Sequence, residues 1–464
     1  MDIAFLTIAE LGRAYDTKEL SPVEVTRALL DRIATHDGKL NSFIRVTPEI
    51  ALTEAEAAER DLMAGTRRGP MHGIPYGLKD IVETAGIATT GHSKLRQDYV
   101  PQADAEIVRR LKAGGGILLG KLATWEFALG GPSFDLPWPP ARNPWDRDRL
   151  PGGSSSGPGA AVAAGFMPAA IGTDTGGSIR GPAAFCGIAG LKPTYGRVSR
   201  RGVFPNTFTM DHIGPMTRSA EDIALMLQVI AGFDAADPGS EDCPVPDYRA
   251  ALDGAVSGLR LGLIEGWHEG AGAHPDLGAA IAEAVAVLER LGATVEPVKL
   301  SSLREYTDCK TTISSVELYS IHERDLRTRP QDFGRILRNR VLPGALIRGE
   351  DYLAALRWRA ALAQEQAAAF RRFDALLTAG ARTIADRADP AHQPDRHVST
   401  PSITMPFSIS GVPALAIPCG FSRDEGMPLS LQIAAPPMQE ATALRIAHAY
   451  QQATDWHRRH PVLF

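Results

Sequence analysis

Short apolar segments alternate with helix-compatible segments along much of the chain, and this alternation limits the fold more than any other feature. Apolar runs that fit strands include "IPYGLKD", "GILLGKL" and "MPAAIGTD", and the segments between them include "DAEIVRRLKAGG" and "AAVAAGF". Residues 258–298 repeat the pattern as a strand, a helix and a second strand. Strands that read as continuous apolar runs are buried on both faces. The pattern therefore predicts an α/β fold around a buried sheet.

The two ends of the chain extend this pattern, whereas residues 300–400 interrupt it. Ser21 and Glu24 predict a capping box before an amphipathic helix. Near the other end, "GVPALAIPCGF" and "PLSLQIAA" predict two strands, and "EATALRIAHAYQQAT" predicts a final helix. The stretch at about 300–400 is helical, charged and irregular, and we interpret it as a variable cap or loop layer. No internal repeat or flexible linker divides the chain.

Composition excludes several classes of function. The net charge of -5 gives no basic surface for nucleic acid, so we expect no nucleic-acid partner. The four cysteines are far apart and form no C-x-x-C pair, which fits a reducing cytoplasm. His392 with His397 and His457 with His460 lack an H-E-x-x-H motif, so we expect no metal site. No apolar run reaches eighteen residues, so we expect no membrane span.

Two glycine-rich turns and one lysine are candidates for the catalytic site. The turns are "PGGSSSGPGAAVAAG" and "TDTGGSIRGPAA", and Lys79 ends the apolar run "GIPYGLK". Ser178 follows two glycines and precedes a helix-compatible run, a place where an oxyanion can be stabilised. No histidine lies within thirty residues of Ser178, so its base is not local. Ser154 lies 24 residues earlier, which leaves room for one helix and one strand between the turns.

Two other motifs compete for these turns. Residues 153–157, "GSSSG", match the G-x-S-x-G nucleophile elbow with Ser155 at its centre. That elbow needs a strand directly before it. Here the preceding "NPWDRDRLPGG" is polar and interrupted by proline, which disfavours an α/β-hydrolase. Neither turn matches the glycine patterns of phosphate-binding loops.

The run from Pro151 to Tyr195, "PGGSSSGPGAAVAAGFMPAAIGTDTGGSIRGPAAFCGIAGLKPTY", resembles the signature of the amidase signature family. "GIPYGLKDIVETAGIATT" resembles the lysine motif of that family, and the similarity extends over most of the chain outside residues 300–400. The resemblance implies one amidase-signature domain over residues 1–464, in which helices cover both faces of a central mixed β-sheet. It places the signature core at about 70–215 and a variable substrate-pocket or cap region at about 300–400.

The resemblance also implies a Ser–Ser–Lys triad made of Ser178, Ser154 and Lys79. A lysine acts as a base only when it is neutral, and burial away from carboxylates lowers its pKa. In this reading, Lys79 accepts a proton through the Ser154 hydroxyl while Ser178 attacks the carbonyl carbon and forms an acyl-enzyme. Ser154 then returns the proton to the leaving amine. The family pattern further implies a cis peptide bond before Ser154.

Further residues take supporting roles in the family pattern. Backbone N–H groups are expected to bind the oxyanion, and they belong to Thr175, Gly176, Gly177 and Ser178. Three side chains are expected to support the triad by hydrogen bonds and ion pairing, namely Ser155, Asp174 and Arg180. Two aromatic residues, Phe134 and Trp138, lie in the segment that leads into the serine loop and are candidates for the substrate pocket.

These observations predict an amidase that hydrolyses a small amide or carbamate through a covalent acyl-enzyme. We expect no metal or other cofactor, a monomer or homodimer in the cytoplasm, and no membrane contact. Esterase or urethanase side activity is compatible with the same chemistry. A non-catalytic scaffold would not need an intact Ser–Ser–Lys set.

The alternative is the glutaminase (A) subunit of a tRNA-dependent amidotransferase. Such family members carry an aspartate before the "GVPA"-like strand to hold the amino group of glutamine. Here Pro401 and Ser402 lie near the expected place, and residues 398–421 contain no acidic side chain. This departure favours a stand-alone hydrolase over a glutaminase subunit.

Overall fold

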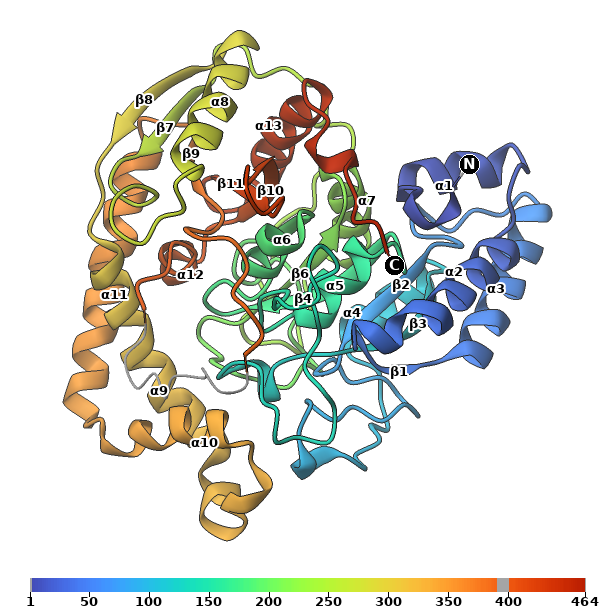
Figure 1. Ribbon diagram of the computed structural model, residues 1–464, viewed down its shortest axis with the longest axis horizontal. Helices are drawn as coiled ribbons and strands as arrows, with labels where there is room; N and C mark the ends of the chain where they lie inside the picture. Colours follow the sequence, from blue (N-terminus) through green and yellow to red (C-terminus); the bar gives the residue numbers. More distant parts are fainter. Residues whose placement is uncertain (1, 390–399, 464) are drawn as a thin grey trace.

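One mixed β-sheet of eleven strands runs through the computed structural model, which describes residues 2–389 and 400–463 (Figure 1). The strand order is β1-β3-β2-β4-β6-β5-β10-β11-β9-β7-β8. The strands are β1 (Phe43–Val46), β2 (Pro75–Lys79), β3 (Ile117–Leu122), β4 (Ala169–Asp174), β5 (Ala189–Lys192), β6 (His212–Thr217), β7 (Arg260–Ile264), β8 (Thr294–Val298), β9 (Ala375–Ala379), β10 (Ala414–Phe421) and β11 (Pro428–Ala434).

Parallel and antiparallel pairing divide the sheet into three parts. At one end β2 pairs in parallel with both β3 and β4, and at the other end β7 pairs in parallel with both β8 and β9. The strands between these ends, from β4 through β6, β5, β10 and β11 to β9, pair antiparallel. β1 adds an antiparallel edge to β3. The predicted α/β fold with a central mixed sheet is therefore confirmed.

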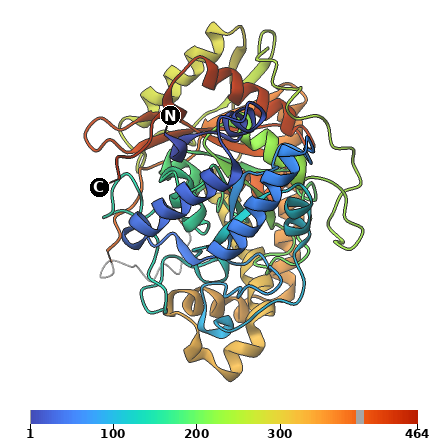
Figure 2. The same ribbon diagram turned by 90° about the vertical axis from the view of Figure 1, so that its right-hand side faces the viewer.

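Helices cover both faces of this sheet. The α-helices are α1 (Ile8–Asp16), α2 (Pro22–His36), α3 (Pro48–Met63), α4 (Glu106–Ala113), α5 (Ser156–Ala163), α6 (Arg180–Cys186), α7 (Ala220–Ile230), α8 (Leu277–Arg290), α9 (Leu303–Thr328), α10 (Arg335–Val341), α11 (Gly349–Phe370), α12 (Met405–Ser410) and α13 (Glu440–Gln452). α5 and α6 pack together on one face, while α7, α8 and α13 pack against the other. The N-terminal helices α2 and α3 lie side by side (Figure 2).

Local sequence signals explain many of these elements. The Ser21 hydroxyl accepts a hydrogen bond from Glu24 N at the start of α2, and Pro22 is its first residue. Every residue of β2, β3 and β4 is buried, as their continuous apolar runs predict. The segment between the two glycine-rich turns forms α5 and β4, one helix and one strand.

Residues 300–400 contain more regular structure than a loop layer. The long helices α9 and α11 pack against each other, and α10 packs on α9. Strand β9 lies inside the sheet, between β11 and β7, and all five of its residues are buried. Residues 390–399, with the His392 and His397 pair, lie outside the described part of the chain. Among the residues described, no helix combines the length and the apolar character that a membrane crossing requires.

Candidate active site

Lys79 is the last residue of β2, and its side chain is fully buried at the end of that strand. Its Nζ atom donates hydrogen bonds of 2.7 Å to Ser154 Oγ and 2.7 Å to Thr173 Oγ1. Burial, opposed by the negative charges of Asp174 and Asp211, lowers the pKa of Lys79 to about 7. The lysine is therefore neutral in a large fraction of molecules at neutral pH and in contact with a serine hydroxyl.

Ser154 lies in the first glycine-rich turn, directly before α5, and the peptide bond between Gly153 and Ser154 is cis. A Cβ atom at Gly153 would overlap the indole ring of Trp125, so the turn needs glycine there. Trp125 N donates to Ser154 O at 3.1 Å. The next residue, Ser155, donates its backbone N–H to Ser178 O at 3.2 Å. The two turns that carry the predicted serines are therefore in direct contact.

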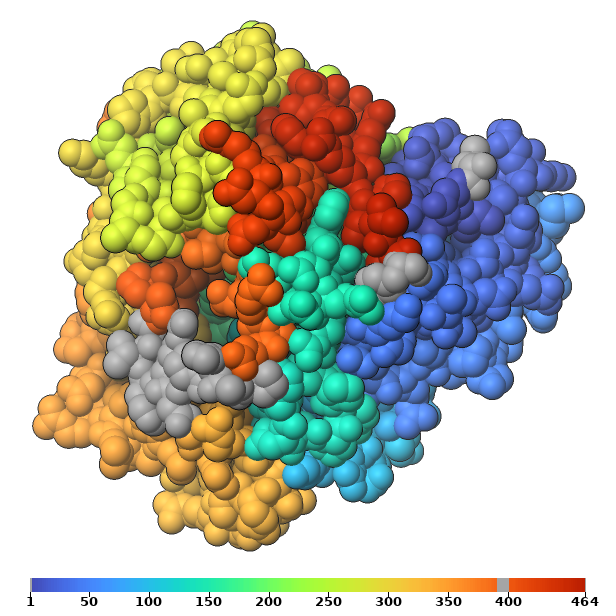
Figure 3. All heavy atoms as spheres, viewed as in Figure 1, coloured from blue at the N-terminus to red at the C-terminus, as the bar shows by residue number. Residues whose placement is uncertain are grey.

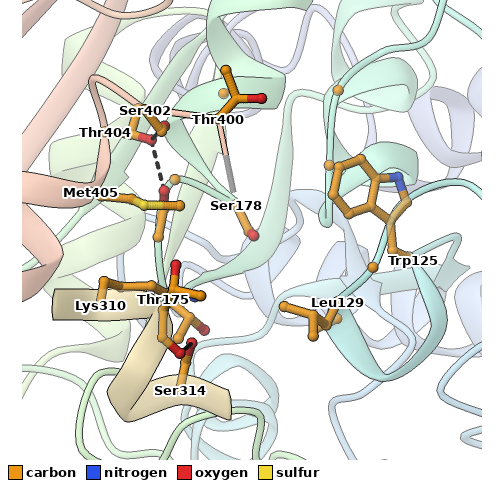
Figure 4. A pocket seen from close by; sticks show the side chains of 18 of the residues that line it. Trp125, Leu129, Thr175, Ser178, Lys310, Ser314, Thr400, Ser402, Thr404 and Met405 are labelled. Atoms are coloured by element: carbon orange, nitrogen blue, oxygen red, sulfur yellow. Dashed lines mark hydrogen bonds between the residues drawn. The ribbon is translucent and has the colours of Figure 1, made fainter. Parts of the chain in front are cut away.

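The second turn joins β4 to α6 and presents Ser178 to a cavity (Figure 4). The Ser178 hydroxyl makes no hydrogen bond within residues 2–389 and 400–463, and the residue is partly exposed. Gly177 has φ +129°, and a Cβ atom there would overlap the Thr404 hydroxyl. Thr404 Oγ1 donates to Gly176 O at 2.7 Å. The nucleophile candidate is thus unhindered, whereas the backbone that carries it is held in place.

The backbone N–H groups of this turn are not all available to an oxyanion. Gly177 N donates to Asp174 Oδ1 at 2.7 Å, which removes it from the predicted set of four donors. The N–H groups of Thr175, Gly176 and Ser178 make no hydrogen bond to the described chain. These three remain candidates for an oxyanion hole.

A buried ion pair stands directly behind the turn. Arg180 donates from Nε to Asp174 Oδ2 at 3.0 Å and from Nη2 to Asp174 Oδ1 at 2.9 Å, and both side chains are fully buried. Burial by itself raises the pKa of Asp174, but Arg180 outweighs it and holds that pKa well below its usual range. Arg180 also donates to Gln432 and Ser408. The pair therefore anchors the turn to β11 and α12.

Ser155 supports the site through hydrogen bonds to the backbone of Thr173. Its Oγ donates to Thr173 O at 3.2 Å and accepts from Thr173 N at 3.2 Å. Thr173 is the residue whose hydroxyl accepts a hydrogen bond from Lys79. Ser155 points at the backbone of β4 rather than at the cavity, which does not suit the elbow arrangement with Ser155 as nucleophile.

The cavity in front of Ser178, which we call the Ser178 cavity, measures about 450 Å³. The chain is visibly hollowed between its orange and teal segments in Figure 3. Residues from distant parts of the chain line it, among them Trp125, Leu129, Lys310, Ser314, Ser402 and Met405. The predicted pocket residues Phe134 and Trp138 do not line this cavity. Phe134 lies beneath the Arg142 guanidinium, and Trp138 packs edge-on against His92, so both are used in packing outside the site.

Several lining residues escaped the sequence reasoning. Trp125 belongs to the same aromatic segment as Phe134 and Trp138, where a tryptophan is as typical of a core as of a pocket wall. Lys310 and Ser314 come from α9, inside the stretch that shows no recognisable motif. The described residues hold no group of three or more histidine, cysteine or acidic side chains that could bind a metal ion.

Comparison with known proteins places this geometry in a family. A family model described as Amidase matches residues 24–444. The A subunit of the glutamyl-tRNA(Gln) amidotransferase of Moorella thermoacetica is 41% identical, with 100% of this chain and 99% of the relative covered. The crystal structure of the corresponding subunit from Thermotoga maritima has a TM-score of 0.81 at 31% identity, covering 97% and 95% of the two chains.

A further solved structure is similar in fold and sequence. It belongs to work on a vestigial protein complex and the evolutionary origins of an s-triazine catabolic enzyme. Its TM-score is 0.90 at 34% identity, with 96% of this chain and 98% of that chain covered.

These relatives correct two sequence-based predictions. The prediction of a stand-alone hydrolase of a small amide or carbamate is wrong, because full-length relatives at about 40% identity are subunits of an amidotransferase. The exclusion of a nucleic-acid partner is wrong for the same reason, since those relatives are named for glutamyl-tRNA(Gln). The net charge of one chain does not report what an assembly of several chains binds.

The missing aspartate near Pro401 and Ser402 led to the wrong prediction of a stand-alone hydrolase. A single position is weaker evidence than sequence identity over the whole chain. The chain belongs to the amidase signature family of enzymes that act on carbon–nitrogen bonds.

Proposed function

We propose that this chain is the glutaminase subunit of a tRNA-dependent amidotransferase, in which it hydrolyses the side-chain amide of glutamine and supplies the ammonia for transfer. The observation that carries the proposal is the 41% identity, over the full length of both chains, to the A subunit of such an amidotransferase. In this role the chain acts in a complex with further subunits that hold the glutamyl-tRNA(Gln).

The hydrogen bond between Lys79 and Ser154, and the backbone contact between the turns of Ser154 and Ser178, support a Ser–Ser–Lys mechanism for the amide hydrolysis. Neutral Lys79 accepts a proton from Ser154 Oγ, 2.7 Å away, as Ser154 takes the proton of Ser178. Ser178 Oγ then forms a bond to the amide carbon, and the negative charge on the oxygen is stabilised by free backbone N–H groups of the turn. Collapse breaks the C–N bond, and the departing nitrogen takes the proton back through Ser154 and leaves as ammonia.

The acyl-enzyme on Ser178 is then hydrolysed by water, which yields glutamate and restores the serine. Activated esters can form the same acyl-enzyme, because their leaving groups need little protonation. Esterase activity is therefore a side reaction that this mechanism permits.

Recognition of the glutamine amino group needs a carboxylate other than the one at the usual family position. Thr400, Pro401 and Ser402 line the Ser178 cavity where that aspartate is expected, and none of them is acidic. Among the described lining residues, Asp386 is the one carboxylate. In this proposal Asp386 accepts the ammonium group, so Asp386→Asn raises KM for glutamine more than it changes kcat.

The experiment compares ammonia release from L-glutamine by the chain alone and by the chain purified with the other amidotransferase subunits. The proposal expects release that depends on Ser178, that increases in the complex, and that is coupled to conversion of glutamyl-tRNA(Gln). Ser178→Ala is the matched control for contaminating glutaminases. A chain that forms no complex with these subunits, and releases no more ammonia from glutamine than Ser178→Ala does, contradicts the proposal.

A further inference from the structure

Lys310 is a buried cation on the wall of the Ser178 cavity that has no counter-ion in the described part of the protein. It lies on the inner side of α9, and only 6% of the residue is exposed. Its ammonium makes no hydrogen bond and no ion pair with residues 2–389 or 400–463. Buried charges in proteins are normally paired, because removing an isolated charge from water is costly. Lys310 has no such partner among these residues, and it lies on the cavity wall, where a bound anion can pair with its ammonium.

The carboxylates whose charges act on Lys310 already accept hydrogen bonds from other donors. Three of them favour the charged form of Lys310, but none lies within ion-pair distance of it. Each instead accepts hydrogen bonds of 2.6–3.0 Å from a different side chain. These carboxylates and their donors are Asp174 with Arg180, Asp211 with Thr175, and Glu317 with Thr209. They cannot turn to Lys310 without losing those bonds.

Lys310 lies close to the place where the reacting carbonyl would bind at Ser178. A Cβ atom built at Gly176 would lie 3.2 Å from Lys310 Cε and 3.6 Å from Nζ. Gly176 is two residues from Ser178, and two residues of chain span at most about 7 Å. Figure 4 shows Lys310 and Ser178 on the walls of the same cavity. An anion on Lys310 and a carbonyl at Ser178 are therefore close enough to belong to one small molecule.

Lys310 also carries its charge at neutral pH. Burial lowers its pKa to about 8, with Asp211 opposing and Arg340 adding to the decrease. The ammonium form thus predominates at pH 7. Arg340 lines the same cavity.

We infer that Lys310 determines substrate specificity by binding a carboxylate on the acyl part of the amide, a few carbons from the scissile carbonyl. The inference rests on the proposed amide hydrolysis at Ser178 and deepens it. It identifies the substrate class as ω-amides of short carboxylic acids, to which glutamine belongs, and assigns their selection to a residue of α9 rather than to the glycine-rich turns.

The test compares anionic and neutral amides of equal length in wild type, Lys310→Met and Lys310→Arg. The anionic amides are malonamate, succinamate and glutaramate, and the neutral partners are the unsubstituted amides of the same chain length. Methionine keeps the length and apolar stem of lysine without its charge. We expect kcat/KM of Lys310→Met to fall on the order of 10- to 100-fold for the best anionic amide, the usual range for a buried hydrogen bond to a charge. For its neutral partner we expect a change below threefold.

Lys310→Arg should retain part of the preference for the anionic amide, because it keeps the charge. Lys299→Met is the control for the loss of one positive charge, since the Lys299 side chain is 87% exposed. It should leave both classes unchanged. Thermal unfolding of each variant checks that the fold is intact. Equal losses on anionic and neutral amides in folded Lys310→Met, or no loss on either, overturn the inference.

A binding measurement separates this inference from the proposed hydrolysis. The same anionic amides are titrated calorimetrically into Ser178→Ala and into Ser178→Ala/Lys310→Met, neither of which needs to turn over. At least tenfold weaker binding to the double variant supports a carboxylate site at Lys310 even if wild type hydrolyses none of the amides, a result that would count against the proposed function alone. Equal binding to both variants overturns the inference whatever the activity.

Discussion

The Lys79 ammonium nitrogen lies 2.7 Å from the Ser154 hydroxyl oxygen, and the structure withdraws both side chains completely from solvent. A buried lysine loses its proton more easily than a lysine in water. The hydroxyl that it contacts can pass a proton on to it. The contact joins the end of β2 to a turn 75 residues later in the chain.

Replacement of Lys79 tests the proton route. Lys79→Ala leaves Ser178 and the free N–H groups in place but removes the base, so kcat/KM for an amide should fall by on the order of 10²–10⁴-fold. An activated ester, whose leaving group needs little protonation, should lose less. Lys79→Arg should not restore amide hydrolysis, because a guanidinium stays charged. Circular dichroism checks that each variant is folded. Near-wild-type amide hydrolysis in folded Lys79→Ala would show that Lys79 is not the base.

The pH dependence should follow the same residue. Because the base must be neutral and burial lowers the pKa of Lys79 to about 7, kcat/KM should rise with pH and level off above about 7. Below that value the neutral fraction, and hence the rate, should fall about tenfold per pH unit. The measurement uses a neutral amide between pH 5.5 and 9, so that the charge of the substrate does not change. A rate that is flat over this range contradicts a base of this pKa.

The Asp174–Arg180 pair should be essential to stability. Arg180→Met leaves the Asp174 carboxylate buried without its partner, which should lower the free energy of unfolding by about 3–5 kcal/mol. Arg290 pairs with Glu283 on the surface, where the two side chains are 63% and 62% exposed. Arg290→Met should therefore change the free energy of unfolding by only about 0–1 kcal/mol. Urea unfolding measures both. Similar values for the two variants would show that the buried pair contributes no more than a surface pair.

Substitution at Gly177 should damage the turn that carries Ser178. Its φ of +129° disfavours any side chain, and a Cβ atom would overlap Thr404, so Gly177→Ala should displace the N–H groups next to Ser178. We expect a loss of roughly 10²-fold in kcat, comparable to that of an oxyanion donor. Gly86 has φ +75° but no atom within 4 Å of its Cβ position, so Gly86→Ala controls for the backbone effect. Equal kcat values for the two variants would show that the conformation of this turn does not affect catalysis.

The sequence by itself determined the elements and the candidate nucleophile. Buried strands read as continuous apolar runs, so β2, β3 and β4 could be predicted from the sequence. β2 ends at Lys79, and β4 leads into the second glycine-rich turn. The resemblance in those turns pointed to Ser178, Ser154 and Lys79, and the structure brings the three segments together. Local patterns succeed here because hydrophobic periodicity and turn chemistry depend on neighbours in the chain.

Only the tertiary structure decided what faces the nucleophile. Phe134 and Trp138 lie close to the serine loop in sequence, yet both pack elsewhere. Lys310 lies next to Gly176 although α9, the helix that carries it, begins only at Leu303. The strand order, with β9 inserted between β11 and β7, likewise has no local signal. These contacts form because packing of the whole sheet brings distant segments together, and the energy of such packing cannot be read from periodicity within one segment.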